Sequence, residues 1–168
     1  KMEIQRHSML KRGAWMKKIN LPAKKIIGIK TRTTNQDNQA EKAITQLWGT
    51  FMLENLIEQI PNKIDSSIYC IYTHYESDFT GEYSVILGCE VSSVDELPKN
   101  MTSIEIPMQN YQVFESKGQI PESIIKTWGE IWSTPLSRAY TADFEKYEPT
   151  DFLKKDAAVE IFIALKGQ

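Results

Sequence analysis

The chain has 168 residues, of which 41% are hydrophobic and 25% are charged. This length and composition are typical of one soluble globular domain with a substantial core, and they exclude fibrous and disordered proteins. The formal net charge of -2 gives no overall attraction to phosphate backbones, so we expect no direct nucleic-acid partner. No apolar run has membrane-spanning length and no secretory signal is recognisable, so we expect a cytoplasmic protein without a membrane partner.

Neither the start of the chain nor its cysteine and histidine residues indicate a DNA-binding motif or a metal site. Residues 1–16 are basic and weakly periodic, and we interpret them as an N-terminal extension, without a helix-turn-helix, of a single domain over 17–168. Cys70 and Cys89 lie inside apolar strand-like runs, which favours buried reduced thiols over a disulfide or a metal site. His7 and His74 have no ligand spacing around them, so we expect no metal and no cofactor.

The remaining chain divides into two similar units, about residues 24–93 and 101–166. Period-two and helical spacing of apolar residues predict strand, helix, strand, strand in each unit. In the first unit these elements are expected at 24–34, from 40 to before 61, at 67–76 and at 82–92. In the second they are expected at 103–114, 118–134, 138–148 and 157–166. Pro107 marks an edge or a bulge in the first strand of the second unit.

The two units also match in individual residues, which indicates an internal repeat. The matched pairs are Ile44 with Ile124, Trp48-Gly49 with Trp128-Gly129, and Ile27 and Ile29 with Ile104 and Ile106. We therefore predict an α+β fold of two strand-helix-strand-strand repeats with pseudo-twofold symmetry, in which a helix packs on each antiparallel sheet. A groove is expected between the copies. Because edge strands can pair with another chain, the oligomeric state is expected to be a monomer or a weak homodimer.

The last strands of the two units have one apolar face and one mixed face. Alternation predicts that the apolar face packs under the helices. Its residues are Tyr83, Val85 and Leu87 in the first unit, matched by Ile161, Ile163 and Leu165 in the second. The opposite face includes Glu82, Glu160 and Phe162, a combination that suits a lined groove as well as solvent.

The stretch 139–148 places acids among aromatic rings in a predicted strand. Alternation puts Asp143, Glu145 and Tyr147 on one face and Phe144 on the other. A partly desolvated carboxylate beside aromatic faces suits an organic cation. The same pattern also fits a solvated acidic face on an edge strand.

Several motifs together resemble the gyrase-inhibitor-like, or effector-binding, domain family over about residues 17–166. They are Trp48-Gly49, the runs 71–76 and 80–83, Ala139 to Glu145, and Val159 to Ile163. The resemblance is closest to stand-alone members encoded in integron cassettes. In this family a glutamate in an aromatic pocket of multidrug-responsive transcription activators binds lipophilic cationic drugs. The resemblance implies that Glu145 is this glutamate and that Tyr147 forms part of the pocket wall.

These observations predict a small-molecule binding module for amphipathic or lipophilic cations. Glu145 is the predicted centre of its site, and the predicted walls are Tyr72, Glu82, Tyr147, Glu160, Phe162, Trp48 and Trp132. Both tryptophans also fit plain core packing, because a helical apolar stripe is usually core. No catalytic residue is assigned.

We expect an effector sensor without its own DNA-binding domain, and the sequence leaves open whether a separate DNA-binding protein is its partner. Two alternatives come from relatives of the fold. One is a hydrolase of cyclopropane-type toxins that uses a glutamate to activate water. The other is a protein inhibitor of DNA gyrase.

Overall fold

The computed structural model describes residues 15–167, which contain eight strands and three α-helices. In chain order the strands and α-helices are β1 (Trp15–Leu21), β2 (Lys24–Thr34), α2 (Gln39–Leu53), α3 (Leu56–Gln59), β3 (Ile68–Thr73), β4 (Glu82–Val91), β5 (Thr102–Ile106), β6 (Gln109–Gly118), α4 (Glu122–Ser133), β7 (Ala142–Tyr147) and β8 (Ala157–Ala164). Two short 3-10 helices, η1 (Gln36–Asn38) and η2 (Pro149–Leu153), precede α2 and follow β7.

All eight strands form one antiparallel sheet in the order β1-β6-β8-β7-β3-β4-β2-β5. This order reads symmetrically from its centre, where β3 of the first unit pairs with β7 of the second. The predicted α+β class with two related halves is confirmed. The sheets of the two halves are joined edge to edge, so the boundary between the copies is a pair of hydrogen-bonded strands.

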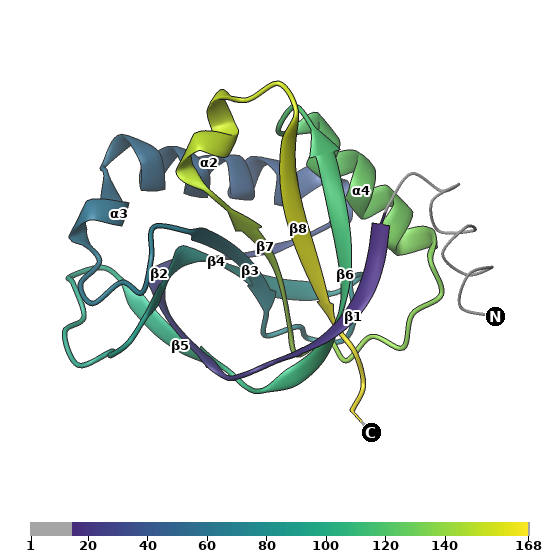
Figure 1. Cartoon of the computed structure of the whole chain (residues 1–168), viewed down its shortest axis with the longest axis horizontal. Helices are drawn as coiled ribbons and strands as arrows, with labels where there is room; N and C mark the ends of the chain where they lie inside the picture. The colour runs from purple at the N-terminus through teal and green to yellow at the C-terminus, as the bar shows by residue number, and fades with distance from the viewer. Residues whose placement is uncertain (1–14, 168) are drawn as a thin grey trace.

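The sheet has a core on each of its faces. On one face, α2 and α4 lie across the strands (Figure 1), and Leu47, Phe51, Ile124 and Ile131 of these helices pack on the sheet. The predicted face under the helices is confirmed for its members within the strands, namely Tyr83, Val85, Leu87, Ile161 and Ile163. Leu165 follows the end of β8.

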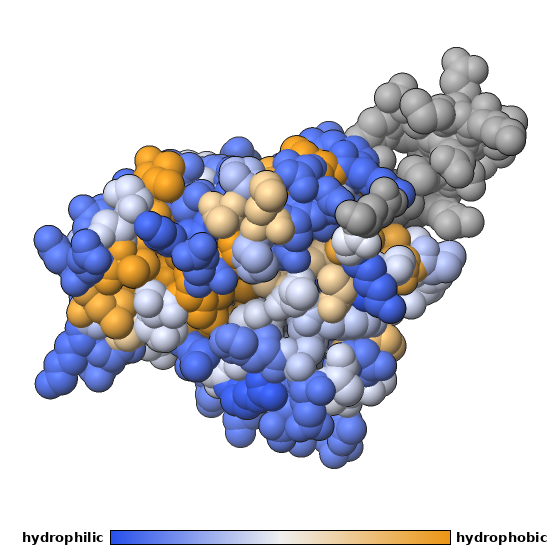
Figure 2. All heavy atoms as spheres, turned by 90° about the horizontal axis from the view of Figure 1, so that it is seen from below, coloured by the Kyte–Doolittle hydropathy of each residue, from blue (hydrophilic) through white to orange (hydrophobic). Residues whose placement is uncertain are grey.

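The other face closes on a second core built from strand residues. Ile86, Phe144 and Phe162 are buried there, because the sheet curves around them. Figure 2, seen from below, shows apolar atoms that extend from the left edge of the molecule toward its centre, among hydrophilic atoms. Partly buried Ile19 and Ile104, from the outermost strands, pack against the same cluster.

The first strand of each half pairs with the other half, a feature that the repeat analysis missed. β1 pairs with β6, and β5 pairs with β2. The predicted strand 103–114 is divided after Ile106 by Pro107 and Met108, which separate β5 from β6. The counterpart of β2 is β6, since each pairs with the last strand of its half. Matching Ile27 and Ile29 to Ile104 and Ile106 was therefore wrong.

The helix boundaries also differ from the prediction. The first predicted helix is interrupted at Asn55, which has a φ of 51° and separates α2 from α3. The second begins at Glu122, because Gly118 still belongs to β6. None of the helices within residues 15–167 combines the length and the apolar character that a membrane crossing requires.

We predict that Gly88→Ala destabilises the fold. Gly28 and Gly88 are paired on β2 and β4, and a Cβ atom on Gly88 would collide with the backbone carbonyl of Ile27. The expected loss is about 1–3 kcal/mol or more in the free energy of unfolding. Gly129→Ala on α4 is the matched control, because its Cβ meets no atom within 4 Å and the change should stabilise the helix by about 0.5–1 kcal/mol. Urea unfolding measures both, and equal effects would contradict the prediction.

Candidate functional site

Glu145 is a buried carboxylate held by three neutral donors. Its residue exposure is 2%. The Tyr72 hydroxyl and the Trp128 indole N–H both donate to Oε2, each at 2.7 Å, and the Tyr147 hydroxyl donates to Oε1 at 2.6 Å. These donors come from β3, α4 and β7. The two halves of the molecule therefore meet at this one carboxylate.

The alternation of β7 explains why Glu145 lies under the helices. Phe144 points into the second core, while Tyr147, two residues beyond Glu145, belongs to the core beneath the helices. In the sheet, Glu145 is flanked by Cys70 of β3 and Ile161 of β8. Because β3 and β7 are the central pair of strands, Glu145 lies at the junction of the two halves.

Two tryptophan–tyrosine contacts frame this junction. Trp48 of α2 meets Tyr147 edge to face, with ring centroids 5.1 Å apart and planes at 84°. Trp128 of α4 meets Tyr72 in the same manner, at 5.2 Å and 73°. Each tryptophan thus contacts the tyrosine of the other half. The predicted equivalence of the two tryptophans is confirmed by these matching contacts.

Burial dominates the electrostatics of the site. Desolvation raises the pKa of Glu145, although hydrogen bonds from Tyr147, Trp128 and Tyr72 act in the opposite direction. Desolvation also raises the pKa of the Cys70 thiol, and the negative charge of Glu145 adds to this effect. Within residues 15–167, no ion pair involves Glu145. Among the described residues, the carboxylate has polar partners but no cationic one.

Asp143 has a different environment, although it shares a face of β7 with Glu145. Its Oδ2 accepts hydrogen bonds from Arg138 at 2.7 Å and from the Tyr75 hydroxyl at 2.6 Å. Its Oδ1 accepts one from the backbone N–H of Ala164 at 2.8 Å. The Arg138 guanidinium neutralises this acid, and it also lies 4.3 Å from the centre of the Tyr140 ring. Of these two acids on one face of β7, Glu145 is therefore the one without an ion pair within residues 15–167.

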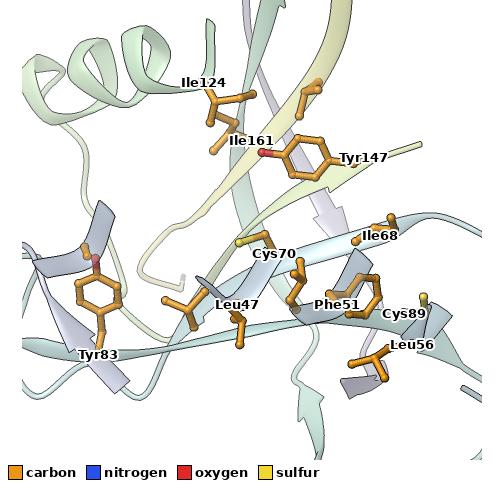
Figure 3. Packing of buried hydrophobic residues seen from close by; sticks show 14 of the residues in the cluster. Leu47, Phe51, Leu56, Ile68, Cys70, Tyr83, Cys89, Ile124, Tyr147 and Ile161 are labelled. Atoms are coloured by element: carbon orange, nitrogen blue, oxygen red, sulfur yellow. The ribbon is translucent and has the colours of Figure 1, made fainter. Parts of the chain in front are cut away.

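The structure brings three of the predicted wall residues to Glu145 or next to it. Tyr72 and Tyr147 bond to it, and Trp48 packs on Tyr147. Trp132 lies further out: it is 50% exposed, stands 6.3 Å from Trp128 and stacks on Phe79. Figure 3 shows Cys70, Tyr147 and Ile161 gathered in the layer beneath the helices.

Three predicted wall residues lie elsewhere, and their grouping with Glu145 needs correction. Phe162 stacks on Phe144 at 4.5 Å in the second core. Glu82 and Glu160 form ion pairs at the surface with Arg32 at 3.6 Å and Lys17 at 3.3 Å. The physical reason is parity: Ile161 faces the helices, so its neighbours Glu160 and Phe162 face away.

Two residues of the site were not predicted as wall residues. Trp128 donates directly to Glu145, and its match to Trp48 in the repeat was the signal that could have identified it. Cys70 stands opposite Glu145 in the strand register and is fully buried. Its position could be inferred only once β3 and β7 were known to pair. Cys70 and Cys89 are both free and buried, as predicted.

Comparisons with known proteins define the class as an effector-binding domain. The family model of the integron-associated effector binding protein matches residues 19–165, and the chain belongs to this family. It is 31% identical over 152 residues to YobU of Bacillus subtilis (strain 168), whose name provisionally assigns it to transcriptional regulation; the match covers 88% of this chain and 95% of YobU.

Two solved structures show the same fold. Integron cassette protein VCH_CASS2, from the mobile metagenome of Vibrio cholerae, is 32% identical, with a TM-score of 0.71, over 90% of this chain and 95% of that one. SAV2435, solved with tetraphenylphosphonium bound, is 21% identical, with a TM-score of 0.77, over 90% of this chain and 94% of that one.

We predict that Glu145→Gln changes stability in a pH-dependent way. Burial raises the pKa of Glu145. At pH values between the pKa of the unfolded chain and that of the folded protein, the folded wild type therefore retains a proton that the unfolded chain releases. Its free energy of unfolding should fall as pH rises from the ordinary carboxyl range through the folded pKa. The glutamine stays neutral at every pH. The free energy of unfolding of the variant, relative to that of wild type, should therefore increase over that pH range, and this increase should be absent at acid pH.

Urea unfolding between about pH 4 and pH 8 measures this difference. Glu105→Gln, on the exposed side of β5, is the matched control and should stay within about 0.5 kcal/mol of wild type. A difference between Glu145→Gln and wild type that does not vary with pH would contradict the prediction.

Proposed function

We propose that this protein binds lipophilic organic cations at Glu145. The observation that carries the proposal is a carboxylate with 2% exposure that has three neutral donors, an aromatic frame and no ion pair within residues 15–167. A buried carboxylate without a cation is costly. A ligand that brings a positive charge and apolar surface offsets this cost.

The energetics of such a site need no elaborate pattern of hydrogen bonds. Each contact between a cation and a ring contributes about 0.5–2 kcal/mol, and burial of apolar ligand surface contributes about 25 cal/mol per Å². Micromolar affinity corresponds to about 8 kcal/mol, which a few rings and one carboxylate can supply. Broad recognition of cations by charge and area follows.

Access to Glu145 requires movement of aromatic side chains, because the carboxylate is buried and the Trp128 indole and two tyrosine hydroxyls are bonded to it. The Trp128 side of the frame continues outward through Trp132 to Phe79, and both of these outer rings are partly exposed. Rotation of Trp128 would open a path lined by aromatic faces. We place ligand entry at this side.

Relatives support the cation and the regulatory role. SAV2435 was solved with tetraphenylphosphonium, a lipophilic cation, and the name of YobU refers to transcriptional regulation. We infer that the chain is an effector sensor in transcriptional regulation.

The hydrolase alternative would require Glu145 to accept a proton from water. Three protein donors already surround its carboxylate, which favours binding over turnover. Gyrase inhibition stays an alternative that a supercoiling assay with the purified protein decides.

We predict that Glu145→Gln weakens binding of a cation and leaves binding of a neutral analogue unchanged. The substitution removes the charge but retains the size of the side chain. Affinity for tetraphenylphosphonium should fall by about tenfold or more, while affinity for uncharged triphenylphosphine oxide should stay within about twofold. Calorimetric titration of both compounds into both proteins measures this. Equal weakening of the two, or no weakening of either, would remove Glu145 as the charge-selecting residue.

A further inference from the structure

The two halves of the site have the same frame but different centres. Each half supplies a helix tryptophan that packs against a central-strand tyrosine of the other half. Between these contacts, Glu145 and Cys70 are directly paired across the β3–β7 boundary. One half of a nearly symmetrical site therefore centres on a carboxylate and the other on a thiol.

We propose that this asymmetry makes the site selective for ligands with one cationic centre, which lies at Glu145, and an uncharged apolar arm, which lies beside Cys70. The proposal rests on the proposed function and narrows its ligand class. Cys70 acts in it as a specificity-determining residue that excludes a second charge.

The charges around the site support this asymmetry. Cys70 is fully buried, and desolvation and the nearby carboxylate raise the pKa of its thiol, so it stays neutral. Asp143, the neighbouring buried acid on β7, is already paired with Arg138 at 2.7 Å. Because Cys70 lies directly opposite Glu145, a second cationic centre in the Cys70 half would have to share the one carboxylate that the first centre already neutralises. It would lose its hydration without a carboxylate of its own, and this is a large desolvation cost.

Two matched probes test how many cationic centres a ligand of this site carries. Both are triphenylphosphonium cations with the same short alkyl arm; one arm ends in tert-butyl and the other in the isosteric trimethylammonium group. Wild type should bind the tert-butyl probe at least about tenfold more tightly by calorimetric titration. Equal affinity would overturn the inference, and it would leave the proposed function intact because both probes are cations.

Moving the carboxylate tests the equivalence of the two halves. Glu145→Cys alone should weaken binding of the tert-butyl probe by about tenfold or more. Adding Cys70→Glu places one carboxylate in the Trp48 and Tyr147 half, and most of the lost affinity should return. A folded double variant without any recovery would overturn the proposal.

The outcomes separate the two claims. If the double variant does not fold, the probe pair on wild type still decides between one charge and two. If wild type binds neither probe, the proposed function fails and the inference fails with it. If wild type binds both cations equally, only the inference fails.

Discussion

The burial of one carboxylate at the boundary between two repeats is the constraint on which the site depends. Glu145 lies on a central strand, and the donors that satisfy it come from β3, α4 and β7. Its pKa is raised by desolvation, so the folded protein carries an electrostatic cost at its centre. Since Asp143 shows that the same strand can hold an acid with a guanidinium partner, the lack of an ion pair at Glu145 within residues 15–167 is a local feature of the site.

The duplicated architecture explains how such a costly group is tolerated. The first strand of each half pairs with the other half, and the central strands pair with each other. Neither half is complete without its partner, and the cores on both faces of the sheet extend across the boundary. The extensive burial of apolar surface offsets a single unfavourable carboxylate. Stability is thus supplied by the whole sheet, while the cost is localised where a ligand can relieve it.

The sequence predicted most elements of the fold because their periodicity is strong. The strand 24–34 is reproduced at both ends, and both hairpins and both helices are present. The swapped pairing of β1 and β5 could not be predicted, because pairing partners leave no trace in the periodicity of a single strand. Alternation within one strand separates its two faces, but it does not relate them to the faces of another strand. Phe162 and Glu145 could be assigned to opposite faces only after β7 and β8 were aligned in the sheet. With a core on each face, a buried aromatic residue does not indicate which face holds the site.

The donors around Glu145 also bear on the kind of cation that fits. Two hydrogen bonds reach Oε2 and one reaches Oε1, and all three come from rings that form the frame. A carboxylate has about four lone-pair positions, so few remain for N–H groups of a ligand. A primary ammonium would have to displace a tyrosine or indole donor to regain the hydrogen bonds that it makes with water. A quaternary or delocalised cation gives up weaker hydration and leaves the donors in place, so charge and apolar area together favour it.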